Sequence, residues 1–125
     1  EAKAPPIINS YGGRSLHEQS HGESFFALMM NRFGGHGFYV LDEPEAALSP
    51  TRQLAMLSRM HQLVQSRSQF LIATHSPILM AYPNAWLYQI TPEGLSRVEY
   101  RQTEHYIVAK RFLNDPEGQI ERLLY

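Results

Sequence analysis

The sequence predicts an α/β fold built from a strand–helix–strand unit, a β-hairpin and two further helices. Two short apolar segments, 38–41 and 69–73, stop abruptly at polar residues, as buried strands of a parallel sheet do. Between them, Ser49-Pro50 is typical of a helix start, with serine as N-cap and proline in the first turn. Because strand and helix alternate, we expect the two strands to be parallel neighbours joined by a right-handed crossover.

The first half of the chain is predicted to contain two helices and one strand. Residues 1–16 are rich in proline, glycine and serine and indicate an extended or loop segment that leads into the domain. Residues 22–33 predict a strongly apolar helix, which the glycines that follow it should end. The strand at 38–41 shows no alternation, so we expect both of its faces to be covered. The helix from Ser49 should run to about residue 66; its predicted inner stripe is Leu54, Leu57, Met60 or His61, and Val64, and its predicted solvated residues are Arg52, Arg59 and Arg67.

The second half is predicted to contain one strand, a hairpin and two helices. The strand at 69–73 is fully apolar after its first residue and is stopped by Thr74-His75-Ser76-Pro77. Each later element is bounded by a turn or a cap. These elements are strands at 86–90 and 95–101 around the turn Pro92-Glu93-Gly94, a helix of about ten residues capped by Thr103, and a short helix after Asp115-Pro116.

The composition indicates a globular chain and argues against several functional classes. Of the 125 residues, 43% are hydrophobic and 18% are charged, which is enough apolar material for a core. The net charge is −1, from 11 basic and 12 acidic residues, so nucleic-acid binding is not indicated. Cysteine is absent, which removes disulfides and thiolate metal sites. No apolar run approaches the roughly 18 residues of a membrane span and no secretory signal is present, so we expect a cytoplasmic protein.

The strongest candidate for chemistry is Asp42-Glu43, at the end of the first predicted strand. Acids at the carboxyl edge of a parallel sheet lie where open α/β sheets bind ligands. One carboxylate can hold a hydrated magnesium ion and the next can polarise a water, which are tasks of phosphoryl transfer. The alternative is structural, because acids before a helix N-terminus are stabilised by its dipole. The short connection 44–50 favours the functional interpretation, since it keeps both carboxylates near the sheet edge.

Ser20-His21-Gly22-Glu23 is predicted to begin the first helix. The segment fits a capping box, with Ser20 as N-cap and Glu23 at the third helical position. The same helix N-terminus can bind an anion, since Gly22 leaves the first amides open. Glu23 would repel a phosphate unless its carboxylate points back to its own backbone. The two interpretations are compatible.

Histidines offer two further candidates. His75 follows the second strand, where it can be a structural residue or can hydrogen-bond a terminal phosphate oxygen or the attacking water. The pentapeptide from His17-Glu18 to His21 matches H-E-x-x-H, a zinc-peptidase pattern that must lie wholly within a helix. Glycines on both sides and the capping preference of Ser20 argue against such a helix. A zinc metallopeptidase is therefore the remote alternative.

In combination, these segments resemble the C-terminal half of an ABC-type ATPase nucleotide-binding domain. The resemblance is to bacterial stand-alone AAA family ATPases of the P-loop NTPase superfamily, and it covers roughly residues 8–91. It implies that 38–43 is the Walker B strand, with Asp42 in the magnesium shell and Glu43 as the base that orients water. His75 would be the switch histidine, which acts with Glu43 in catalysis.

Two further motifs of this family have counterparts in the chain. The resemblance implies a signature motif in which Ser20, Gly22 and Glu23 contact nucleotide held by a second subunit, although His21 and Glu23 replace the usual glycine and glutamine. It also implies a D-loop that contains Leu48 and Ser49, where aspartate is common in place of serine. The whole chain would then be the C-terminal portion of one domain. Its parts would be a loop lead-in (1–19), a signature helix (20–37), a core from Walker B to the switch histidine (38–91), and a hairpin return with C-terminal helices (92–125).

One motif of the family has no match. The sequence contains no G-x-x-x-x-G-K-[ST] loop, so nothing in it would wrap the β-phosphate or neutralise it with lysine. We therefore expect the partial P-loop NTPase sheet of a fragment, whose N-terminal half with Walker A is missing. A vacancy is expected between the strand ending at Ala73 and the hairpin, closed by repacking, by strand exchange or by the missing half.

The expected function is ATP binding and hydrolysis in the complete protein, with ATP and Mg²⁺ as cofactors and a head-to-tail homodimer as the assembly. The chain alone should show no turnover, because positioning and charge neutralisation supply nearly all of phosphoryl-transfer catalysis. The alternative is a non-catalytic dimerisation or interaction module that retains half of the fold. The motifs do not indicate which process the ATP would power.

Overall fold

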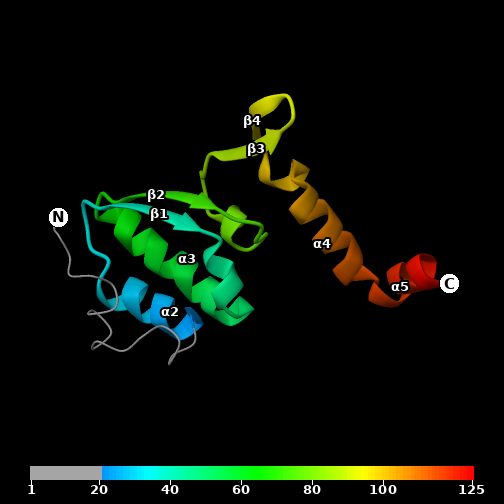
Figure 1. Cartoon of the computed structure of the whole chain (residues 1–125), viewed down its shortest axis with the longest axis horizontal. Helices are drawn as coiled ribbons and strands as arrows, with labels where there is room; N and C mark the ends of the chain where they lie inside the picture. The colour runs from blue at the N-terminus through cyan, green and yellow to red at the C-terminus, as the bar shows by residue number, and fades with distance from the viewer. Residues whose placement is uncertain (1–20) are drawn as a thin grey trace. The chain divides into compact units, whose positions relative to one another are not determined.

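The computed structural model describes residues 21–125, with side chains from Ser24 onward. These residues form a mixed α/β structure with four α-helices and two sheets of two strands each (Figure 1). The chain divides into two compact units, one ending at Thr74 and the other spanning His75–Tyr125, and each contains one of the sheets. None of the α-helices described here is both long and apolar enough to cross a membrane.

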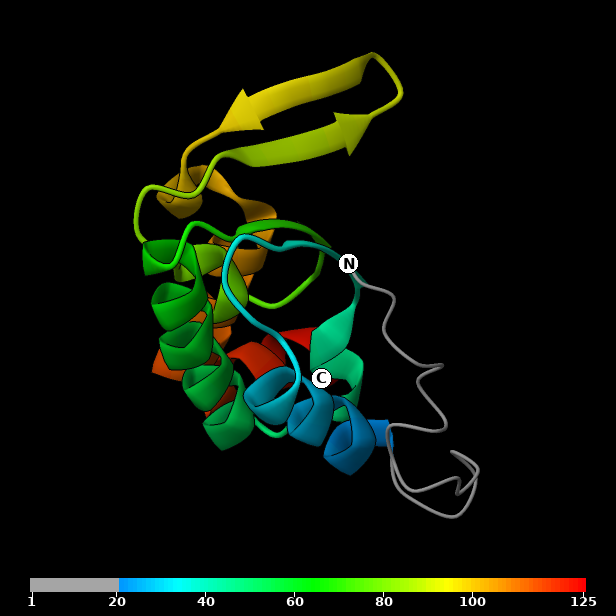
Figure 2. The same cartoon turned by 90° about the vertical axis from the view of Figure 1, so that its left-hand side faces the viewer.

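The first unit consists of two helices on one side of a parallel strand pair. Strands β1 (Phe38–Asp42) and β2 (Gln69–Ala73) run parallel with their last residues opposite each other, which confirms the predicted strand–helix–strand unit. Figure 1 and Figure 2 both show the two helices on the same side of these strands. In chain order, the elements are α2 (His21–Asn31), β1 (Phe38–Asp42), a short 3-10 helix η2 (Pro44–Ala47), α3 (Pro50–Gln65) and β2 (Gln69–Ala73).

The core of this unit lies between the helices and the inner face of the strands. Tyr39 and Leu41 of β1, and Phe70 and Ile72 of β2, are half-buried on this face. The ring of Phe33 stacks on Tyr39 with centroids 4.1 Å apart, and the Tyr39 and Phe70 centroids are 5.3 Å apart. The buried hydrophobic residues are Met29, Leu48, Met56, Met60 and Leu63.

The opposite, outer face of the strand pair is open. Phe38 and Val40 of β1 are 61% and 65% exposed, and Leu71 of β2 is 61% exposed. The prediction that the first strand is covered on both faces is therefore wrong, because one layer of helices packs on the pair. Among residues 21–125, each strand also pairs with one other strand, so each has an edge without a strand partner. Parallel strands in proteins are normally covered on both faces.

Helix α3 begins where the sequence predicts, but of the predicted inner stripe only Met60 is buried. Ser49 is the N-cap, and its Oγ accepts a hydrogen bond from the Arg52 amide at 3.2 Å. Leu54 is 57% exposed and Val64 is 37% exposed, so both are wrong as core residues. The buried residues of α3 are Met56, Met60 and Leu63.

Two of the three arginines predicted to be solvated connect α3 to α2. Arg59 donates from Nε to the Met29 carbonyl at 3.1 Å and from Nη2 to the Phe33 carbonyl at 2.8 Å. The guanidinium of Arg52 lies 4.7 Å from the centroid of the Phe26 ring, which is a cation–π contact. Arg59 thus satisfies one carbonyl in the last turn of α2 and one just after the helix.

The second unit contains a hairpin followed by two helices. Strands β3 (Leu87–Thr91) and β4 (Gly94–Val98) pair antiparallel and form a sheet of their own within the described residues. The predicted extension of the second strand to residue 101 is wrong, because β4 ends at Val98 and is followed by a 3-10 helix, η4 (Tyr100–Gln102). Gly94 has a φ of 125°, a conformation that glycine adopts without strain, and this permits the short turn.

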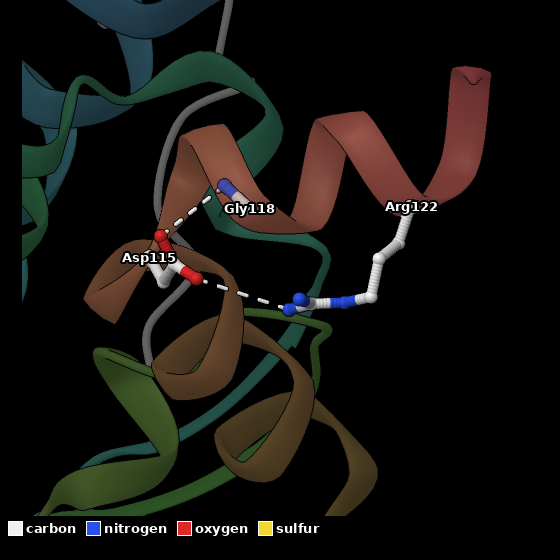
Figure 3. Close-up of polar contacts among 3 residues, drawn as sticks. All are labelled: Asp115, Gly118 and Arg122. Carbon is white, nitrogen blue, oxygen red and sulfur yellow. Dashed lines mark hydrogen bonds and ion pairs between the residues drawn. The ribbon is translucent and has the colours of Figure 1, made fainter.

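Helices α4 (Glu104–Asn114) and α5 (Pro116–Leu124) complete the second unit, and both are capped by side chains. As predicted, Thr103 caps α4, and its Oγ1 accepts a hydrogen bond from the Tyr106 amide at 3.1 Å. Figure 3 shows the start of α5, where Asp115 Oδ1 accepts from the Gly118 amide at 3.2 Å. Asp115 Oδ2 also lies 3.8 Å from Nη2 of Arg122, one turn further along the helix.

Candidate functional site

Asp42 and Glu43 lie at the carboxyl end of β1, beside the end of β2. Asp42 is the last residue of β1 and is paired with Ala73, the last residue of β2. The Glu43 amide donates to the Ala73 carbonyl at 2.7 Å, so backbone pairing continues one residue beyond the strand. Both acidic residues are exposed. Adjacent carboxylates at this edge are suited to a hydrated divalent cation and a water.

Glu43 has a backbone conformation that glutamate rarely adopts. Its φ of 50° and ψ of 55° lie in the left-handed region. A residue with a Cβ adopts this region at a cost of about 1–2 kcal/mol, and such residues cluster at functional sites. The buried Pro44 follows and begins η2, so the chain turns sharply at Glu43 itself. The acid pair was predicted, but nothing in the sequence indicates this conformation.

An open pocket of about 440 Å³ lies against the acid pair. Its size falls within the range of small-molecule sites. The two carboxylate residues contribute its acidic side, and the rest of the lining is apolar. The lining residues are Phe25, Val40, Leu41, Asp42, Glu43, Pro44, Ala46 and Ala47.

Thr74 and Glu45 form a contact that the sequence did not suggest. Thr74 Oγ1 donates to Glu45 Oε1 at 2.6 Å, which links the residue after β2 to the segment after β1. Together with the Glu43–Ala73 hydrogen bond, this contact holds the two strand ends together. The strand ends therefore form one rim, which carries the acid pair.

The two residues assigned to the D-loop have structural roles in this unit. Leu48 is 7% exposed and belongs to the core, while its carbonyl accepts from Gln53 Nε2 at 3.2 Å. Ser49 is the N-cap of α3. These contacts fix the connection between η2 and α3, and they leave the assignment of a D-loop as a prediction.

The residues assigned to the signature motif fall at the edge of the described part of the chain. Ser20, and with it the capping-box and phosphate-contact predictions, lies outside the described residues. Gly22 and Glu23 belong to the first turn of α2, which begins at His21, and the side chain of Glu23 also lies outside the described part of the chain. His17 and Glu18 of the zinc alternative are outside as well. Within the described part, no group of three or more His, Asp or Glu side chains could hold a metal ion.

His75 is the first residue of the second unit, two positions after the end of β2. Its Nδ1 lies 3.0 Å from Nε2 of His105, and the two ring centroids are 5.2 Å apart. His105 lies in the first turn of α4 and was not a predicted site residue. A search for histidines near His75 in sequence would miss it, because the partners are 30 residues apart.

Comparisons with family models, with curated proteins and with solved structures gave no match to this chain. The functional interpretation therefore depends on the residues and the geometry described above. These comprise an acid pair on a rim formed by two parallel strands, a strained Glu43 beside an open pocket, and a histidine pair in the second unit.

Proposed function

We propose that this chain supplies the hydrolytic half of an ABC-type ATPase domain and acts on ATP with Mg²⁺. The observation that carries the proposal is the placement of Asp42 and Glu43 at the carboxyl end of a parallel strand pair, with Glu43 in the left-handed conformation beside an open pocket. A strained residue persists where the surrounding structure requires it. Here the strain coincides with the residue that the sequence pattern assigns to catalysis.

In this proposal each residue has one task. Asp42 would hold Mg²⁺ through a water, and Glu43 would orient the water that attacks the γ-phosphate. His75 would hydrogen-bond an oxygen of that phosphate. Ser20 and Gly22 would contact the nucleotide of a second subunit in a head-to-tail dimer, through a helix N-terminus suited to anions. Mg²⁺ would neutralise charge that develops in the transition state.

The proposal also requires a phosphate-loop segment, on the same polypeptide or on another. The exposed outer face of β1 and β2 and their unpaired edges support this requirement, because such strands usually have further neighbours. Without a lysine-containing loop around the β-phosphate, residues 1–125 alone should show no measurable turnover. Hydrolysis by the purified chain of 125 residues would contradict this part of the proposal.

Glu43→Gln tests the catalytic assignment in the longest natural polypeptide that contains these residues. The amide keeps the shape of the side chain but cannot act as a base, so kcat should fall by about 10²–10⁴-fold while KM for ATP changes little. Glu93→Gln, in the hairpin turn, is the matched control and should leave both constants unchanged. Turnover by Glu43→Gln near the wild-type rate would refute the role of Glu43.

The open outer face also supports a second candidate, a non-catalytic interaction module. In that case Phe38, Val40 and Leu71 would be covered by a protein partner, and no nucleotide would be needed. The longest natural polypeptide decides between the two. A phosphate loop and calorimetric binding of MgATP support the ATPase, whereas the absence of both supports the module.

A further inference from the structure

His75 and His105 are close enough to share a proton between their rings. His75 Nδ1 lies 3.0 Å from His105 Nε2, and the ring planes are inclined by 29°. The two residues come from separate segments, the loop after β2 and the first turn of α4. A hydrogen bond at this distance needs one nitrogen that carries a proton and one that offers a lone pair.

The loop that carries His75 is held in place by the next residue. Ser76 is 4% exposed, and its Oγ accepts hydrogen bonds from the amides of Ile78 and Leu79, each at 3.1 Å. A side-chain cap of this kind fixes the backbone immediately after His75. The backbone that follows His75 is therefore held independently of the contact between the His75 and His105 rings.

The segment that carries His105 is anchored in the same way and is tied to the loop. Thr103 is 6% exposed and caps α4 two residues before His105. Tyr100 OH donates to the Pro77 carbonyl at 2.6 Å, which connects the start of this segment to the loop. Burial, together with the charge of Tyr106, raises the pKa of Tyr100, so the hydroxyl remains a donor at neutral pH. Hydrogen bonds thus hold both backbone segments that carry the pair.

Which of the two nitrogens carries the shared proton decides whether Nε2 of His75 can donate a hydrogen bond. If His75 Nδ1 carries the proton, a neutral His75 has a lone pair on Nε2 and cannot donate to a phosphate. If His105 Nε2 carries the proton, a neutral His75 must carry its own proton on Nε2 and can donate. A histidine that contacts a phosphate oxygen has to be a donor, because phosphate oxygens only accept.

We propose that His105 is a positioning residue, which donates from Nε2 to His75 Nδ1 and so holds His75 in the tautomer with its N–H on Nε2. The ligand of that N–H, a terminal phosphate, rests on the proposed function. The choice between the two tautomers rests on it as well, since the 3.0 Å contact fits either direction of donation, but the tautomer can be measured in this chain without nucleotide. Partners behind a first histidine commonly fix its tautomer and ring orientation.

Long-range ¹H–¹⁵N spectra of the ring nitrogens test the tautomer at pH 8, with His75→Gln used to assign the signals. In the wild-type chain, the neutral His75 ring should carry its proton on Nε2. His105→Gln should retain it, since an amide can still donate, whereas His105→Glu should move it to Nδ1, since a carboxylate only accepts. A wild-type proton on Nδ1, or identical tautomers in wild type and His105→Glu, would overturn the proposal. If His105→Glu does not fold, His105→Ala replaces it and should give a mixture of both tautomers.

Hydrolysis assays in the polypeptide that supplies the phosphate loop separate this inference from the proposed function. His105→Glu should lower kcat about 10–100-fold with a smaller change in KM, and His105→Gln should restore most of the activity. If His75→Ala hydrolyses ATP like wild type, the phosphate role of His75 is wrong, while the spectra still decide the tautomer. If His75→Ala is impaired but His105→Glu is not, His105 has no positioning role.

Discussion

Replacing Glu43 by glycine and, separately, by alanine isolates the cost of its backbone conformation. Both substitutions remove the carboxylate, but glycine alone adopts a φ of 50° without strain. The left-handed conformation costs a residue with a Cβ about 1–2 kcal/mol, and glycine loses about 0.5–1 kcal/mol through the freedom of the unfolded chain. The glycine variant should therefore exceed the alanine variant by about 0.5–1 kcal/mol in free energy of unfolding, or by about 2–8 °C in Tm.

Urea unfolding followed by circular dichroism measures this difference, and amide exchange at residue 43 localises it, since that amide donates to the Ala73 carbonyl. Ala46→Gly is the matched control. Ala46 lies in η2 and does not have a positive φ, so glycine there should destabilise by about 0.5–1 kcal/mol. The reasoning is refuted if glycine is less stable than alanine at position 43 as well as at position 46. Neither variant at 43 should support hydrolysis.

Two further predictions concern contacts that hold the helices. Arg59→Ala should lower the free energy of unfolding by about 2 kcal/mol, because the Met29 carbonyl in α2 and the Phe33 carbonyl after it lose a charged donor. Substitution of the exposed Arg67 by alanine should change that free energy by less than about 0.5 kcal/mol in the same urea titration. Asp115→Ala should destabilise α5 by about 1 kcal/mol, because the helix loses its cap. Hydrogen exchange of the Gly118 amide should become faster and measures this loss. Arg122→Ala should change that rate little, since its ion pair with Asp115 is long and exposed; equal effects of the two substitutions would contradict the cap as the main contribution.

The helix caps that the sequence predicted correctly have a local cause. Ser49 and Thr103 each accept a hydrogen bond from an amide three residues ahead, so residue type and spacing identify the cap. The strand pair was predicted from two apolar segments of similar length with a helix between them, and its parallel register places Asp42 opposite Ala73. That register is what brings the acid pair to the rim.

The features that sequence did not predict depend on residues far apart in the chain. Which residues of α3 are buried depends on where α2 packs. Met56 is therefore buried, whereas Leu54, a residue of the predicted stripe, is exposed. The Thr74–Glu45 contact joins residues 29 positions apart, and the His75–His105 pair joins residues 30 positions apart. No periodicity or motif encodes such pairings.

The acid pair lies on a rim that two contacts within the first unit hold together. The Glu43–Ala73 backbone bond and the Thr74–Glu45 contact fix the rim. The outer sheet face contributes to neither contact, and its apolar residues are exposed. Affinity for ATP comes mainly from a loop around the phosphates, whereas catalysis comes from groups positioned for the transition state. A separate phosphate-loop segment would therefore meet acids that are already in place, and Glu43→Gln should then alter kcat while binding of MgATP stays intact.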